Sequence, residues 1–316
     1  MELLGGLSLT VFVLYVGRQI ANADLDAGAY TAFITAFLMA YQPAQRLSGT
    51  WVKLQRKFKL VNQMLSVLGD ETPPKWGTKL LTEDAKLSIS DVHYNFAKNA
   101  PALRGISLEF EPGDRVAIVG PSGAGKTTLI DLIQGFYAPT KGQVKIGGID
   151  ISELSHKTLL DSIALVTQDV FLFAGSIREN IRDGKPDATD AEIESAAKRA
   201  AVLDFTSHMP NGLDSDVGPN GSALSGGQKQ RVGLARALLK PARVYIFDEA
   251  TSALDGETET RVMRETLNSL QQVIVLFITH RQATLNWFER IVVIDNGVLS
   301  EGGLDQALKL GAVSRY

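Results

Sequence analysis

The stretch that decides the fold runs Gly120-Pro121-Ser122-Gly123-Ala124-Gly125-Lys126-Thr127 and has the spacing of a phosphate-binding P-loop. The run Arg115–Val119 before it is typical of a β-strand, and a helical pattern begins near Lys126. Glycines in this loop allow a tight turn that points N–H groups at phosphate oxygens, and the helix N-terminus adds a positive dipole end. We therefore expect a nucleoside triphosphate here, with Lys126 on its β- and γ-phosphates and Thr127 on a Mg²⁺ ion.

Two carboxylates follow another strand pattern further along the chain. Asp248 and Glu249 come directly after the apolar run Val244–Phe247. Because α/β folds bind ligands beyond the carboxyl ends of their parallel strands, we expect this pair beside the P-loop. Asp248 is predicted to hold Mg²⁺ through water, and Glu249 to accept a proton from an attacking water. Without the P-loop, the same pair would indicate only the start of a loop.

A second anion site is predicted at Leu224-Ser225-Gly226-Gly227-Gln228, where an amphipathic helix begins. Its two glycines expose backbone amides beside the Ser225 hydroxyl. As an isolated turn and N-cap this segment is ordinary. The P-loop already accounts for one nucleotide, so this site would serve another phosphate or a nucleotide held by another chain.

The composition excludes several classes of protein. The 316 residues carry 32 Lys and Arg against 35 Asp and Glu, which gives no bulk attraction to nucleic acid. Cysteine is absent, which excludes thiol chemistry and cysteine metal sites. Strand and helix patterns alternate after a Pro- and Gly-containing linker at 71–85, which predicts an α/β domain with a largely parallel sheet over 86–316. The expected strands include Ile106–Phe110, Arg115–Val119, Ile163–Thr167, Val244–Phe247, Val273–Ile278 and Ile291–Ile294, and helices are expected at Lys126–Gln134, Asp190–Val202, Gly226–Leu239 and Glu257–Leu270.

Residues 1–70 are richer in apolar side chains than the rest. Leu3–Val16 and Ala27–Tyr41 are almost entirely apolar, and basic residues follow the second run from Arg46 to Lys59. Each run is shorter than the roughly 20 residues of a full membrane span. A signal peptide, a pair of buried soluble helices and a basic nucleic-acid helix are the alternatives. We expect two partial membrane helices with a cytoplasmic exit, because basic residues favour the cytoplasmic side.

Together, the P-loop and the pentapeptide Leu224–Gln228 make residues 86–316 resemble the nucleotide-binding domain of ATP-binding cassette (ABC) proteins. The resemblance implies a P-loop NTPase domain with a helical subdomain. In that family two such domains pair head to tail, and each ATP lies between one P-loop and the partner's pentapeptide. The resemblance also implies that Gln168 contacts Mg²⁺ or the attacking water, that His280 contacts the γ-phosphate, and that Asp255 lies at the dimer seam.

The resemblance places an aromatic residue against adenine, and Phe96 stands at that position. Tyr94 is the alternate, because two residues back along an expected strand it would point to the same face. No Asn-Lys-x-Asp element is present to recognise guanine, so ATP is favoured over GTP. The residues predicted to contact ATP are Phe96, Gly120, Pro121, Ser122, Gly123, Ala124, Gly125, Lys126, Thr127 and Thr128, with Leu224, Ser225, Gly226, Gly227 and Gln228 facing the partner's ATP.

The order of segments resembles the C-terminal part of an exporter half-transporter, in which six membrane helices precede the cassette. Residues 24–64 would be the last of these helices and its extension. We expect ATP-driven export at the inner membrane with the cassette in the cytoplasm, the lipid bilayer as a partner and no nucleic acid. A second ABC subunit is also expected, which makes a homodimer, with a heterodimer as the alternative. A non-transporting ATP-binding remnant and a soluble ABC ATPase are the alternatives. Pro219, where exporters usually carry Glu, puts the usual coupling contact in question.

Overall fold

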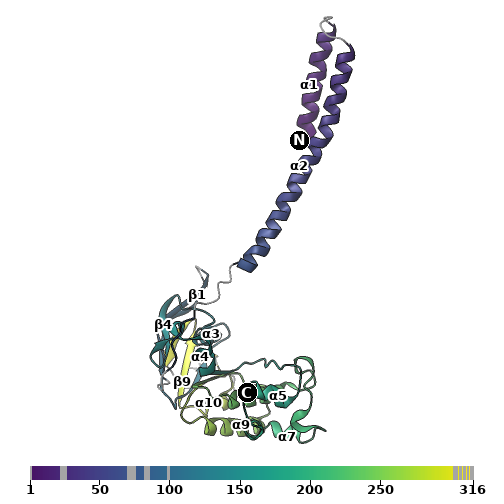
Figure 1. The fold of residues 1–316 in the computed structure, drawn as a ribbon. Coiled ribbons are helices and arrows are strands. Elements are labelled where there is room, and N and C mark those ends of the chain that lie inside the picture. The colour runs from purple at the N-terminus through teal and green to yellow at the C-terminus, as the bar shows by residue number, and fades with distance from the viewer. Residues whose placement is uncertain are drawn as a thin grey trace. The chain divides into compact units, whose positions relative to one another are not determined.

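The computed structural model describes residues 2–21, 27–69, 76–81, 86–97 and 100–301, together with 305, 308, 311 and 313. It divides into two compact units, Met1–Pro74 and Lys75–Tyr316 (Figure 1). Most of the predicted linker, at 71–75 and 82–85, lies outside the described residues. The remaining linker segment belongs to the second unit, where Trp76 stacks on His156 with ring centroids 4.6 Å apart.

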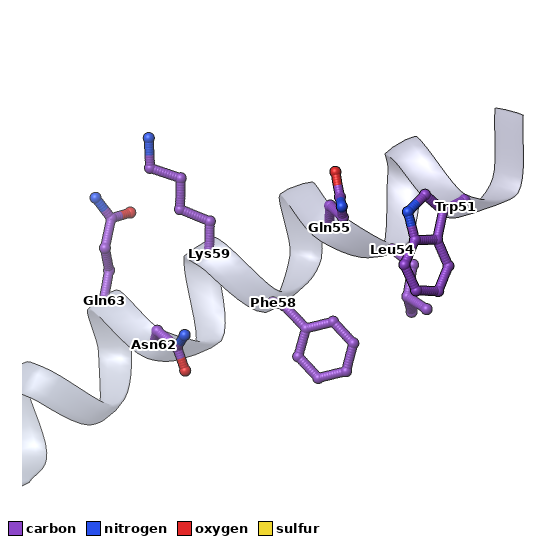
Figure 2. A pocket seen from close by; sticks show the side chains of 7 residues that line it. All are labelled: Trp51, Leu54, Gln55, Phe58, Lys59, Asn62 and Gln63. Atoms are coloured by element: carbon purple, nitrogen blue, oxygen red, sulfur yellow. The ribbon is translucent and has the colours of Figure 1, made fainter. Parts of the chain in front are cut away.

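The first unit consists of two helices, α1 (Glu2–Ala21) and α2 (Ala27–Gly69). Across the described residues, neither they nor any other helix combines the length and the apolarity needed to cross a membrane, so the expected membrane helices are not confirmed. The C-terminal half of α2 exposes large apolar side chains, including Trp51 and Phe58. Figure 2 shows these two side chains on α2 together with Leu54 and the polar Gln55, Lys59, Asn62 and Gln63, and all seven line one pocket.

The second unit is organised around a sheet of six strands in the order β10-β9-β3-β8-β7-β6. The five strands from β9 to β6 run parallel, and β10 joins the edge in the antiparallel direction. Their apolar runs are buried on both faces, which is the pattern of a covered parallel sheet. The strands are β3 (Arg115–Val119), β6 (Ile163–Val166), β7 (Val244–Asp248), β8 (Ile274–Ile278), β9 (Arg290–Asp295) and β10 (Val298–Glu301).

A smaller antiparallel sheet covers one face of this central sheet. Its order is β2-β1-β4-β5, with β1 at Leu87–Ala97, β2 at Ala100–Phe110, β4 at Lys141–Ile146 and β5 at Ile149–Asp150. One apolar cluster joins its side chains to alternate residues of the parallel strands, such as Val116 and Ile118, while their neighbours Ala117 and Val119 belong to a second cluster on the other face. The period of two along each strand therefore divides the core into two layers.

The second cluster joins the sheet to a helical part of the unit. Helices α5 (Ile177–Arg182), α6 (Asp190–Arg199) and α7 (Val202–Thr206) all pack on α8 (Gly226–Leu239). Figure 1 shows α5 and α7 at one end of the unit, apart from β1 and β4. The other helices are α3 (Lys126–Ile133), α4 (His156–Ser162), α9 (Gly256–Ser269) and α10 (Gln282–Leu285), and short 3-10 turns lie at Ile151–Glu153, Gly212–Asp214 and Pro219–Gly221.

The predicted α/β P-loop fold is confirmed, with one expected helix interrupted. The pattern Asp190–Val202 predicted a single helix, whereas α6 ends at Arg199 and α7 begins at Val202. Ala201 between them has φ = 55°, a left-handed conformation that stops an α-helix. Arg231 of α8 donates to the Ala201 carbonyl at 3.1 Å, so tertiary contacts stabilise this break.

Candidate functional site

The P-loop connects β3 to α3 by turns that require glycine. Gly123 and Gly125 have φ values of 78° and 106°, in the region that favours glycine. A side chain at Gly125 would also meet Ala102 O at 2.7 Å and Leu103 Cδ2 at 2.8 Å. A side chain at Gly120 would collide with the Ile294 carbonyl. The loop is therefore held close to two neighbouring strands, which fixes the direction of its amides.

Lys126 lies over this loop at the start of α3. Its Nζ donates to Gly120 O at 2.8 Å and to Pro121 O at 2.9 Å. Burial lowers the pKa of the Lys126 ammonium, and the nearby carboxylates Glu249 and Asp248 act in the opposite direction. The ammonium group thus lies between the loop carbonyls and the acidic pair, where a phosphate chain on the loop would lie within its reach.

The acidic pair lies at the carboxyl end of β7. Asp248 is the last residue of this strand, which pairs with β8, and β8 pairs with β3. Burial raises the pKa of the Asp248 carboxyl, as does the charge of Glu249, while Lys126 acts to lower it. Neighbouring strands lie about 4.8 Å apart, so the sheet brings these carboxylates near the loop.

Glu249 and His280 contact each other directly. His280 Nδ1 lies 3.0 Å from Glu249 Oε1, and the two residues follow the adjacent strands β7 and β8. The Glu249 backbone has φ = 49°, and its N–H donates to Ile278 O at 3.0 Å. A non-glycine residue in this region is strained, and such strain persists where the surroundings determine the backbone. The pairing brings together the predicted base and the predicted γ-phosphate ligand.

Gln168 follows β6, the strand next to β7, and its side chain is exposed. The P-loop, His280, the acidic pair and Gln168 therefore follow four adjacent parallel strands at one edge of the sheet. Thr127 is also exposed, whereas Thr128 is buried at 7% exposure. The order of the strands therefore brings residues that are spread over more than half of the chain to one edge of the sheet.

Three aromatic rings gather near the P-loop helix. Tyr94 lies 5.1 Å from Phe96 and 5.3 Å from Tyr137, and Phe96 lies 6.0 Å from Tyr137, all measured between ring centroids. Phe96 is 60% exposed and Tyr137 is 41% exposed. Tyr137 was not predicted from the sequence, although its place shortly after the P-loop helix was a signal that it lies near the predicted nucleotide site.

The pentapeptide Leu224–Gln228 begins α8. The Ser225 hydroxyl accepts from the Gln228 N–H at 3.3 Å, and the Gln228 side chain accepts from the Ser225 N–H at 2.8 Å. This reciprocal capping box leaves the hydroxyl proton of Ser225 available as a donor. Ser225 and Gly226 are exposed, while a side chain at Gly227 would meet Ala253 O at 2.7 Å. The segment thus presents polar groups to solvent from a fixed position.

Asp255 caps α9. Its carboxylate accepts from the Thr258 N–H at 3.0 Å. The hydrogen bonds from the Thr258 N–H and hydroxyl lower the pKa of this exposed carboxyl. The predicted seam residue therefore also has a local structural role as a helix cap.

Pro219 opens a 3-10 turn before the pentapeptide. Asn220 in this turn has φ = 51°, and Lys229 of α8 donates to its carbonyl at 3.0 Å. The Asp216 carboxylate accepts from the Gly218 N–H just before it. The turn that contains Pro219, the residue that differs from the exporter pattern, is thus hydrogen-bonded to α8.

Within the described part of the chain, no three His, Asp or Glu side chains form a metal-binding group by themselves. The predicted Mg²⁺ residues offer the Thr127 hydroxyl, the Asp248 carboxylate and the Gln168 amide. These oxygen donors fit Mg²⁺, which proteins commonly bind through one or two carboxylates together with substrate phosphates and water.

A family model described as "ABC transporter" matches residues 103–252, which include the P-loop, Leu224–Gln228 and the acidic pair. The chain carries an ABC-transporter cassette. Its cassette is accordingly an ATPase domain, and an ABC ATPase domain binds nucleotide.

Known relatives cover nearly all of the chain. An ATP-dependent lipid A-core flippase of Chromobacterium violaceum is 37% identical over 97% of this chain and 53% of the relative. A second protein with that name, from Thiobacillus denitrificans, is 38% identical over 100% of this chain and 55% of its own length. A bacterial Atm1-family ABC exporter solved with ATP bound has a TM-score of 0.72 and 33% identity, covering 88% of this chain and 50% of that one. The chain spans about half the length of these relatives.

Proposed function

We propose that the chain binds Mg²⁺-ATP and hydrolyses it to drive export across a membrane, as the cassette-bearing part of an exporter subunit. The observation that carries this proposal is the contact between Glu249 and His280 at the sheet edge that also bears the P-loop. A P-loop alone indicates nucleotide binding. A carboxylate oriented by an imidazole at the same edge adds the means to activate water.

In this proposal the triphosphate binds to the P-loop amides and to Lys126. Thr127, Asp248 and Gln168 would hold Mg²⁺, which would supply positive charge beside the phosphates. Phe96 stacks on adenine, with Tyr94 and Tyr137 supporting its ring. The exposed Ser225 hydroxyl donates to the γ-phosphate of an ATP held by the partner subunit.

Hydrolysis then follows in-line attack by water on the γ-phosphorus. Glu249 accepts the proton of this water as the new P–O bond forms and the bond to the β,γ-bridging oxygen breaks. ADP and inorganic phosphate leave. His280 holds the Glu249 carboxylate and contacts the γ-phosphate. These roles extend the observed contact between the two residues to the nucleotide.

The proposed assembly is a homodimer in which Asp255 lies at the seam. Residues 1–70 would belong to the membrane domain, 71–85 to a linker and 86–316 to the cytoplasmic nucleotide-binding domain, with the protein in the inner membrane and lipid as a partner. Coverage of about half of the lipid A-core flippases supports this division, since their matched part includes both units of this chain.

Two substitutions test the catalytic roles separately. Glu249→Gln removes the proton acceptor but keeps the size of the side chain, so we expect ATP affinity close to that of the parent and a kcat lower by roughly 10²- to 10⁴-fold. Lys126→Ala removes the phosphate-binding charge and should abolish tight ATP binding. Nucleotide binding and phosphate release on the full chain are the measurements.

Exposed residues outside the site supply the controls. Glu153→Gln and Lys157→Ala make the same chemical changes at side chains that are 52% and 89% exposed. Both should keep the parental affinity and kcat. Parental turnover in Glu249→Gln would show that Glu249 is not the base, and unchanged affinity in Lys126→Ala would contradict the P-loop assignment.

A further inference from the structure

Gln230 is a buried amide that sits among the residues of the site without being part of any predicted motif. It lies on α8, shortly after the capping residue Ser225, and is only 4% exposed. A buried polar side chain is costly unless its hydrogen-bonding groups find partners. The partners of Gln230 therefore show what this residue does.

Four hydrogen bonds join Gln230 to two other segments, Gln168 and the turn from Glu249 to Ala253. Its Nε2 donates to Ser252 Oγ at 3.0 Å and, at 3.4 Å each, to the main-chain carbonyls of Gln168 and Glu249. Its Oε1 accepts from the Ala253 N–H at 2.9 Å. Because a backbone N–H only donates, the atom facing Ala253 is the oxygen, and the orientation of the amide is fixed.

These bonds fix the backbone conformation of the turn that begins at Glu249. The left-handed backbone of Glu249 is held from both sides: its N–H donates to Ile278 O, and its carbonyl accepts from Ser252 N at 3.0 Å. Gln230 adds a further donor to the same carbonyl and also binds the Ser252 side chain. One side chain of α8 thus supports the strained turn from which the Glu249 carboxylate extends.

We propose that Gln230 is a positioning residue for hydrolysis: it locks the turns carrying Glu249 and Gln168 to α8, the helix that begins with the exposed Ser225. A displacement of α8 would therefore move the proton acceptor and the metal-binding segment together. This inference rests on the proposed ATPase activity. It adds a residue whose amide acts through two others and makes no contact with ATP itself.

A purely structural amide would behave differently. Loss of its hydrogen bonds would lower stability, with no selective effect on the chemical step. A positioning residue, when substituted, leaves the P-loop and ATP binding intact but displaces Glu249. Since errors of about 1 Å at a catalytic group cost up to 10²-fold in rate, the two roles separate in kcat and KM.

The test uses two substitutions in the full chain. Gln230→Met keeps the volume and removes all four hydrogen bonds. Gln230→Glu keeps an acceptor for Ala253 N but turns a carboxylate toward the oxygens of Ser252, Gln168 and Glu249. We expect both variants to lose kcat by roughly 10- to 100-fold with a KM for ATP within about twofold of the parent. If Gln230→Met does not fold, Gln230→Glu carries the same comparison.

Tyr245→Phe is the matched control. The Tyr245 hydroxyl is also buried against a turn, where it donates to Lys240 O and accepts from Ala242 N. Its loss should lower the melting temperature in the way a lost buried hydrogen bond does, with kcat unchanged. A double variant with Glu249→Gln adds a second readout. Since Gln230 acts partly through Glu249, adding Gln230→Met should lower the residual rate of Glu249→Gln by a smaller factor than it lowers the kcat of the parent.

Each outcome decides one claim. A parent that hydrolyses ATP, with Gln230→Met at the parental kcat, would overturn the positioning role and leave the proposed function standing. Equal proportional losses in the parent and in Glu249→Gln would show that Gln230 does not act through Glu249. A parent chain that binds ATP without hydrolysis would overturn the proposed function, and the positioning role with it.

Discussion

Glu249 is held in place through its backbone, its side chain and its carbonyl group. Its backbone has φ = 49°, its side chain contacts His280 at 3.0 Å, and its carbonyl is bound by Ser252 N and by Gln230. Left-handed backbone costs an ordinary residue on the order of 1–2 kcal/mol. A residue kept in such a conformation at the end of a buried strand is therefore held there by its neighbours, which suits a group whose direction matters for chemistry.

This strain predicts a reversed order of stability for two small replacements. We expect Glu249→Gly to have a free energy of unfolding about 1 kcal/mol higher than Glu249→Ala, because glycine adopts positive φ freely. Denaturation by urea measures the difference. Glu265, an exposed residue inside α9, is the control. There the alanine variant should have a free energy of unfolding about 1 kcal/mol higher than that of the glycine variant. Equal stabilities at position 249, or the order seen at 265, would contradict the strained backbone.

Single residues were predicted from sequence where a local motif fixes them. The P-loop, Asp248 with Glu249 and the pentapeptide each occupy a short stretch, and the resemblance to ABC proteins supplied Gln168 and His280. Gln230 was not found, since its partners lie between 19 and 62 residues away and no local pattern links them. Tyr137 was missed because its meaning depends on the proximity of β1. The predicted roles of these residues toward ATP stay predictions.

Local capping chemistry shapes the helical part of the cassette. Helices α5, α6 and α8 each begin with a capping box, formed by Ser176 with Glu179, Thr189 with Glu192, and Ser225 with Gln228. Short helices need such caps, because their first N–H groups lack partners within the helix. In α6 the box is strengthened by Lys185, whose Nζ lies 2.6 Å from the Glu192 carboxylate.

The α6 box predicts a pH-dependent contribution to stability. The hydrogen bond from Lys185, followed by those from the Thr189 N–H and hydroxyl, lowers the pKa of Glu192 from 4.5 to about 2. Since the folded pKa is depressed, the stabilisation is complete above 4.5 and is lost as the pH falls toward about 2. We expect Glu192→Ala to be less stable than the parent at pH 7, with the difference shrinking across this window.

Chemical denaturation at a series of pH values measures this difference. Glu194→Ala is the control, because it removes an exposed carboxylate from the same helix and leaves the box intact. Its effect at pH 7 should be smaller than that of Glu192→Ala. A stability difference for Glu192→Ala that stays constant as the pH falls below 4.5 would contradict the assignment.

At the same scale, elements were predictable where their apolar pattern was continuous. The parallel strands β3, β7 and β8 each contain an uninterrupted apolar run, and the sequence predicted them close to their observed limits. Strand β1 was predicted only around Tyr94 and Phe96, and not over its full length. Its alternation is interrupted by register shifts around Asp91, which has φ = 46°, so its buried residues Leu87, Ile89 and Val92 do not follow a period of two.

The chain has all the residues predicted at the sheet edge that bears the P-loop, and it also has a pentapeptide, Leu224–Gln228, that is partly exposed to solvent. Ser225 and Gly226 are exposed at the start of α8, and they belong to the same chain as the P-loop edge. In the proposed homodimer each copy supplies its P-loop to one ATP and its pentapeptide to the other. Coverage of about half of the curated relatives leaves this arrangement a proposal for the chain.

The most direct test of the composite site is the mass of Glu249→Gln in solution with and without Mg²⁺-ATP, measured by sedimentation of the full chain. We predict one copy without nucleotide and two copies with it, because ATP that is bound but not hydrolysed holds the copies together. Adding Gly226→Glu, which has room for a side chain but places a carboxylate where the partner's phosphates would lie, should abolish the dimer. A mass of one copy with ATP bound, or a dimer that forms equally well with Gly226→Glu, would contradict the composite site.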